Sequence, residues 1–252
     1  MSWARLPLAW LIPYGRASTQ QWIVQSGNLG YPVAGNVASH TTTLQSYGCG
    51  EQNMAYSDFT LDDLKTQFQL SLVEDKRLFG EVKPFDVPAS LLHVLESNVP
   101  LALAIDTEKA RSEFIIAPIL AEYKRIFTHR VSLFSGVDFS IDPQRGLNGT
   151  CDFIISRSPE QFYINAPIII IVEAKNDRIK SGLPQCLAEM IAAQQFNTHR
   201  GNGIETVYGV VSTGSLWRFL KLAAQEGTID RDEYHVREVK QLFGILASMI
   251  GE

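Results

Sequence analysis

The chain has 252 residues, of which 45% are hydrophobic, and a net charge of −5 at neutral pH. This composition is typical of a globular chain of one large domain or two small ones. The acidic balance argues against a broad basic surface for nucleic acid. No apolar run approaches the roughly twenty residues of a membrane span, and the three cysteines show no metal-type spacing. We therefore expect a cytoplasmic protein without membrane contact.

Residues 1–53 differ in composition from the rest of the chain. Only three of their side chains carry a full charge, Arg5, Arg16 and Glu51. We interpret this segment as a poorly ordered extension. Another explanation is translated non-coding sequence upstream of a natural start at Met54. A secretory signal over residues 6–12 is disfavoured, because Pro7 interrupts the apolar run and no small-residue cleavage site follows.

A helical N-terminal segment is expected over residues 54–104. Leu61, Leu64 and Phe68 recur at helical spacing and predict a short helix. A second helix is predicted over residues 90–97. We expect it to end at Asn98-Val99-Pro100, because proline disfavours helical backbone in the residue before it.

Residues 105–252 are expected to form an α/β domain with a C-terminal helix. A helix is predicted over 108–127, with a kink at Pro118, and the turn Thr213–Ser215 is expected to lead into a strand over 216–222. The remaining predicted elements are strands over 131–141, 151–156, 168–173 and 207–213, and helices over 184–197, beginning near Pro184, and 236–250. The order gives an αβββαβ core, a mixed sheet flanked by helices.

Charged residues gather at the end of one predicted strand. The five branched aliphatic residues of 168–172 suit a buried central strand, and Glu173-Ala174-Lys175 follows directly. Glu173 and Lys175 share a face, because side chains two apart on a strand point the same way. If residues 157–166 turn the chain into an antiparallel pair, Asp152 lies next to Glu173. Two carboxylates and an ammonium at one sheet edge can hold a divalent hard cation and activate water against a phosphodiester.

Asp152, followed after a spacer by Glu173-Ala174-Lys175, resembles the signature of the PD-(D/E)xK nucleases, which have the restriction-endonuclease-like fold. The likeness is closest to the N-terminal nuclease domain of type I restriction-enzyme motor subunits and to small stand-alone relatives, over roughly residues 105–225. Two further residues match the pattern. Glu113 corresponds to the acid on the helix before the sheet, and Gln185 to the glutamine on the helix after it.

The chain also departs from the family pattern at two positions. Cys151 stands where the family name has proline, and Glu189 stands where the exonuclease branch has tyrosine. The first change matters little, because that proline is often absent. The second leaves the handling of DNA ends open.

The resemblance implies a magnesium-dependent nuclease that hydrolyses DNA, with Mn²⁺ as a possible substitute and a role in restriction or repair. We expect the ligands of the ion to be Asp152, Glu173 and the carbonyl of Ala174. Lys175 would orient the nucleophile or stabilise charge on the phosphoryl oxygens. Gln185 would hold the phosphate or a water.

Several alternatives remain open from the sequence. Lys175 could form a buried salt bridge with Asp152 and Glu173 in an inactive nuclease-fold module that binds nucleic acid or a protein partner. A third hypothesis is a hydrolase for another phosphate ester. The sequence leaves open DNA or RNA as substrate, a homodimer, and a separate motor or recognition subunit. A local basic patch, or merely solvated loops, is expected from seven cations in or after the site: Lys175, Arg178, Lys180, His199, Arg200, Arg218 and Lys221.

Overall fold

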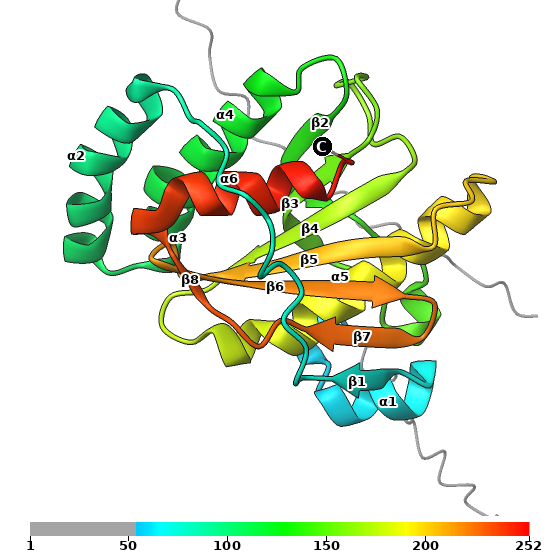
Figure 1. Ribbon diagram of the computed structural model, residues 1–252. Coiled ribbons are helices and arrows are strands. Elements are labelled where there is room, and N and C mark those ends of the chain that lie inside the picture. Colours follow the sequence, from blue (N-terminus) through cyan, green and yellow to red (C-terminus); the bar gives the residue numbers. More distant parts are fainter. Residues whose placement is uncertain (1–53, 252) are drawn as a thin grey trace, which may run out of the picture. The chain divides into compact units, whose positions relative to one another are not determined.

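The computed structural model describes residues 54–251, so the expectations for residues 1–53 lie outside the described part of the chain. The described part is built on a mixed sheet of eight strands in the order β1-β7-β6-β5-β4-β3-β2, with β8 paired to β6 (Figure 1). The pairs β1–β7 and β4–β5 are parallel, and the other pairs are antiparallel. The predicted α/β class, a mixed sheet flanked by helices, is confirmed.

The strands fall close to their predicted positions in the middle of the chain. Those predicted from periodicity are β2, which is shorter than expected, β3, β4, β5 and β6. Three further strands, β1, β7 and β8, were not predicted. The bounds are β1 (Ser71–Val73), β2 (Ser132–Asp138), β3 (Thr150–Ser156), β4 (Ile168–Ala174), β5 (Thr206–Ser212), β6 (Leu216–Ala223), β7 (Glu226–Ile229) and β8 (Tyr234–His235).

Helices precede, interrupt and follow the strands. They are α1 (Leu61–Phe68), α2 (Ala89–Ile105), α3 (Glu108–Arg111), a π-helical turn (Ser112–Ile116), α4 (Ala117–Ile126), α5 (Ile179–His199) and α6 (Val239–Ser248), with short 3-10 turns at Tyr56–Asp58, Pro143–Arg145 and Val236–Glu238. With α3, the π-helical turn and α4 taken as one helical stretch, where the sequence predicted a single helix, the order of elements from α3 to β5 is αβββαβ.

Prolines do not end the helices where the sequence suggests. The predicted end of a helix before Pro100 is wrong, because α2 continues to Ile105. The predicted start near Pro184 is also wrong, because α5 begins at Ile179 and buries Ile179 and Leu183. In both cases tertiary packing outweighs the local cost of proline.

Pro118 follows the π-helical turn and stands in the first turn of α4. We expected the helix to be irregular at Pro118, and the irregularity is the π-helical turn just before this proline. Proline has no N–H to donate to the carbonyl of Phe114, four residues earlier. Asn98 of α2 donates its side-chain amide to that carbonyl instead, at 3.1 Å. The carbonyl of Phe114 is thus free to accept the hydrogen bond from Asn98 that fixes α2 to the next helical segment.

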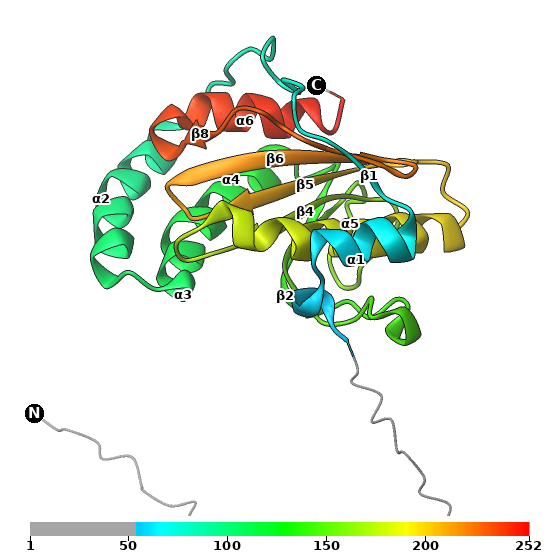
Figure 2. The ribbon, with the colours of Figure 1, turned by 90° about the horizontal axis from the view of Figure 1, so that it is seen from below.

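The two faces of the sheet are covered by different helices. In Figure 2, α6 lies along one face, and α5 and α1 lie along the other. Val172 and Ala174 of β4 pack in the core on the α6 side, and Ile171 packs in the core on the α5 side. Because side chains alternate along a strand, Glu173 points toward α5. Residues 54–104 join the same body, since β1 pairs with β7.

Candidate active site at the end of β4

Asp152 and Glu173 lie on neighbouring strands. Phe153 of β3 is opposite Val172 of β4 in an antiparallel pair, so the next position brings Asp152 opposite Glu173. The backbone N–H of Ala174 donates to Asp152 Oδ2 at 2.8 Å. The predicted antiparallel pairing is confirmed, and it brings the two carboxylates to the same end of the sheet.

Lys175 and Gln185 complete a chain of polar contacts on the α5 side. Lys175 Nζ donates to Glu173 Oε1 at 2.6 Å and to Gln185 Oε1 at 3.1 Å. The side chain of Lys175 is 18% exposed and that of Glu173 is 2% exposed. The lysine therefore reaches the site with little freedom, held by a strand neighbour and by a helix.

Gly182 allows the stem of Lys175 to lie against α5. A Cβ atom at this position would lie 2.7 Å from Val211 Cγ1 and 3.0 Å from Lys175 Cγ. Such distances are shorter than side chains tolerate in a close-packed interior. The glycine thus sets the distance between the helix and the two strands that carry the site.

Glu189, one helical turn after Gln185, is a site residue that the sequence marked only as a departure from a family pattern. It is fully buried, and its Oε1 accepts a hydrogen bond from Gln185 Nε2 at 3.2 Å. Within residues 54–251, its Oε2 and that of Glu173 are buried without a hydrogen-bond partner. Burial, and then the charge of Glu173, raise the pKa of Glu189 well above its usual range.

The electrostatics of Glu173 and Lys175 follow from their burial. Burial, and then the charge of Asp152, raise the pKa of Glu173 to about 8, although Lys175 opposes this shift. For Lys175, burial lowers the pKa, but the charge and hydrogen bond of Glu173 outweigh it, so the pKa is raised. Both groups therefore bind their protons more tightly than they would in water, with the pKa of each raised above its usual value.

Two acids of the helical segment before the sheet, Glu108 and Glu113, differ in their relation to the site. Glu113 lies on the π-helical turn, where its side chain is 53% exposed and its Oε1 is 2.6 Å from Lys109 Nζ. Glu108, the first residue of α3, makes a smaller contribution than burial and the nearer charges to the raised pKa values of Glu173 and Lys175. Asp152, Glu173, Lys175 and Gln185 come together, and Glu113 is not seen among their contacts in the described part of the chain.

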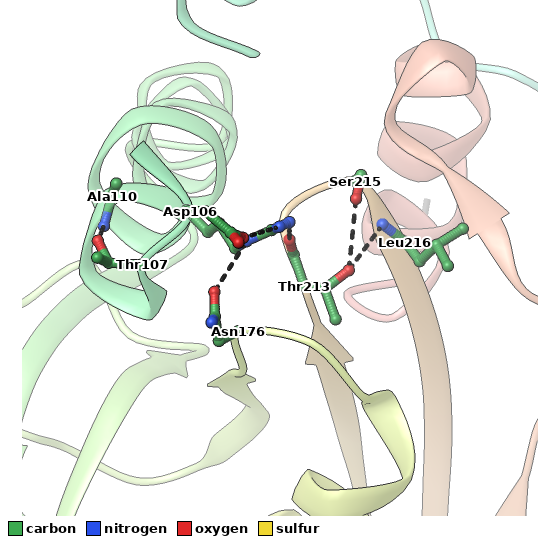
Figure 3. Close-up of polar contacts among 8 residues, drawn as sticks. Asp106, Thr107, Ala110, Asn176, Thr213, Ser215 and Leu216 are labelled. Atoms are coloured by element: carbon green, nitrogen blue, oxygen red, sulfur yellow. Dashed lines mark hydrogen bonds and ion pairs between the residues drawn. The ribbon is translucent and has the colours of Figure 1, made fainter. Parts of the chain in front are cut away.

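Arg111 of α3 holds the loops that follow β4 and β5. Its side chain is only 12% exposed. Its Nε donates to Asn176 Oδ1 at 3.1 Å, Nη1 to the carbonyl of Thr213 at 2.9 Å, and Nη2 to Asp106 Oδ1 at 2.8 Å. Figure 3 shows Asp106, Asn176 and Thr213 gathered around this point. The segment directly after Lys175 is thereby tied to the helix that carries Glu108.

The predicted basic patch is divided between the two ends of α5. Lys180, near the start of the helix, and Arg218 line one cavity. His199 and Arg200 lie at the other end, where the Arg200 guanidinium stacks over Phe196. A helix of 21 residues separates its ends by about 30 Å. These cations therefore cannot act as one local surface.

A metal site here would use two carboxylates. Within residues 54–251, no group of three or more His, Cys, Asp or Glu side chains is arranged to hold a metal ion.

Among the described residues, no helix is both long and apolar enough to cross a bilayer. Neither a scan against protein-family models nor a search of curated proteins gave a match.

Proposed function

We propose that this chain is a magnesium-dependent nuclease that hydrolyses DNA phosphodiester bonds, with a core of the restriction-endonuclease-like, PD-(D/E)xK type and a role in restriction or repair. One observation carries the proposal. Asp152 and Glu173 face each other across adjacent strands, and Lys175 lies on the same side, 2.6 Å from Glu173. The αβββαβ order from α3 to β5 supports it further.

The donor set fits a hard cation. Magnesium prefers oxygen ligands and keeps several waters, so the carboxylates of Asp152 and Glu173 with the carbonyl of Ala174 would be enough from the protein. The buried, unpartnered Oε2 of Glu173 supports a positive charge at this place. When bound, the ion would supply charge neutralisation at the phosphate and a water of lowered pKa.

The other side chains have separate tasks in this proposal. Lys175 would direct its ammonium at the phosphoryl oxygens, where charge develops during attack. Gln185 would orient this lysine, because its oxygen accepts from Lys175 and its amide donates to Glu189. Glu173 must give up its proton to hold a cation, since only the carboxylate is a good ligand. Activity should therefore rise with pH toward the raised pKa of Glu173.

A second candidate is a non-catalytic module of the same fold that binds nucleic acid or a protein partner. The contact of Lys175 with Glu173 favours it, because this hydrogen bond can hold the two side chains together without any metal ion. The net charge of −5 favours the form of this module that binds a protein partner, since contact with nucleic acid gains from a basic surface. The two candidates differ in whether Asp152 is needed for turnover or only for stability.

Cleavage of supercoiled and linear DNA in Mg²⁺ or Mn²⁺ separates them. The wild type should cut, chelator should stop the reaction, and Asp152→Ala and Glu173→Ala should abolish it while each variant still melts cooperatively. Glu205→Gln, an exposed acid at the opposite end of β5, is the matched control and should cut normally. DNA binding without cleavage by the wild type would favour the module. Persistent cleavage by Asp152→Ala would contradict the nuclease mechanism.

A further inference from the structure

The sheet end that carries the candidate site extends beyond it, toward β6. Glu173 is opposite Val211 of β5, and Val211 is opposite Arg218 of β6. Val211 packs in the core on the α5 side, so Glu173, Val211 and Arg218 share that face. Neighbouring strands lie about 4.8 Å apart, which puts the Arg218 backbone about 10 Å from that of Glu173.

Two cavities continue this row around the same end of the sheet. One of about 520 Å³ lies against the start of α5, and its lining includes Lys180 and Leu183. The other, of about 940 Å³, lies toward the start of α6. Arg218, Arg231 and Glu233 line both cavities, so the two adjoin at these side chains. We call this pair of cavities the β6 groove.

The β6 groove is positively charged in an acidic chain. Six cationic side chains line it: Arg77, Lys180, Arg218, Arg231, Arg237 and Lys240. Four acidic side chains line it: Glu74, Asp232, Glu233 and Glu238. Six positive and four negative lining charges leave an excess of two positive charges, of which Asp86 offsets one through its ion pair with Lys240 at 2.9 Å, whereas the whole chain carries −5. The sign of the local charge favours an anionic ligand.

Arg218 is the cation with the most fixed position in the groove. Its Nη2 donates to Glu233 Oε1 at 2.6 Å and its Nη1 to the carbonyl of Asp230 at 3.3 Å. Its side chain is 25% exposed. A guanidinium has five N–H donors, so these two contacts leave others for a ligand in the groove. Prior fixation reduces the entropy lost when a phosphate binds.

We propose that the β6 groove holds the phosphodiester backbone of DNA on one side of the phosphate that is cut, with Arg218 as its fixed contact. This inference rests on the proposed nuclease function. With its backbone about 10 Å from that of Glu173, Arg218 would contact the strand within a few nucleotides of the reacting phosphate. Two cavities in series suit an extended polymer better than a single small phosphate ester.

Binding of labelled duplex DNA in EDTA, followed by fluorescence anisotropy, tests the groove. Arg218→Ala should weaken binding several-fold and reduce the salt slope by about 0.9, the loss of one phosphate contact. Glu233→Gln should have the opposite effect and strengthen binding, because it removes a negative charge from the groove. Arg200→Ala, at the far end of α5, is the control and should leave affinity unchanged. If Arg218 were only structural, both groove variants would bind DNA like the wild type, which overturns the inference.

The outcomes distinguish this inference from the nuclease proposal. A wild type that neither binds nor cuts DNA would overturn the proposed function. It would also overturn the proposal that DNA occupies the β6 groove. A wild type that cuts, together with a folded Arg218→Ala that binds equally well, would overturn the groove alone. Should Arg218→Ala fail to fold, Lys180→Gln replaces it, because Lys180 is exposed. Lys180→Gln should weaken DNA binding, because it removes one positive charge from the groove. Unchanged affinity would overturn the inference about the groove.

Discussion

Replacing Glu173 with glutamine should change how the stability of the protein depends on pH when no divalent ion is present. Burial and the charge of Asp152 raise the pKa of Glu173 from 4.5 to about 8 in the folded chain. Between these values, the folded chain binds a proton that the unfolded chain has lost. The free energy of unfolding should therefore fall as pH rises through this window. Below it both states are protonated, and above it neither is.

The magnitude follows from one linked proton. One extra proton in the folded state gives a slope of about 1.4 kcal/mol per pH unit. From about pH 5.5 to about pH 7.5 the loss is therefore about 3 kcal/mol, a large part of typical domain stability. Glu173→Gln cannot exchange this proton. Its slope should therefore be flatter by about this amount.

Urea unfolding in EDTA at about pH 5.5, 6.5 and 7.5 measures the effect directly. Relative to the wild type, Glu173→Gln should gain about 3 kcal/mol of stability across this range. Glu205→Gln, an exposed acid, is the control and should keep the wild-type slope. A difference between wild type and Glu173→Gln that stays constant with pH would refute the burial argument.

Two further predictions concern the supports of the site. Gly182→Ala should lower the free energy of unfolding by about 1–3 kcal/mol in urea, because its Cβ overpacks against Val211, and should reduce cleavage by displacing Lys175. An unchanged stability would show that α5 is not held so close. Glu108→Gln should weaken Mn²⁺ binding in calorimetry more than Glu113→Gln does, because the charge of Glu108 acts on Glu173 and Lys175. Equal effects would contradict the assignment of Glu108.

Hydrophobic pattern was enough to predict the middle of the fold. The aliphatic run of β4 and the apolar spacing of α6 each identify an element by themselves. The pairing of β3 with β4 followed from the short connection between them. By contrast, β1 has three residues and β8 has two, so both strands are too short to show a periodic pattern of hydrophobic residues. β1 depends on pairing with β7, more than 150 residues later in the sequence, and local sequence does not encode that contact.

The site was predictable where it lies on adjacent strands and less so where helices contribute. The proximity of Asp152, Glu173 and Lys175 follows from strand register alone. The choice between Glu108 and Glu113 depends on which side of the helix faces the sheet. The π-helical turn after Arg111 changes which of the following residues face the sheet. Glu189 could have been found as an acid four residues after Gln185, between buried neighbours. Its burial is nevertheless set by the packing of α5, not by its own sequence neighbours.

The most direct test of the nuclease proposal is the rate of plasmid nicking by Lys175→Ala, measured at Mg²⁺ concentrations that saturate both this variant and the wild type. Lys175 is not a ligand in the proposed site, so metal affinity should be largely kept. Loss of its ammonium should nevertheless slow nicking by about 100-fold or more, as for other single donors to developing charge. A wild type that does not nick DNA, or a Lys175→Ala that nicks at the wild-type rate, would contradict the account.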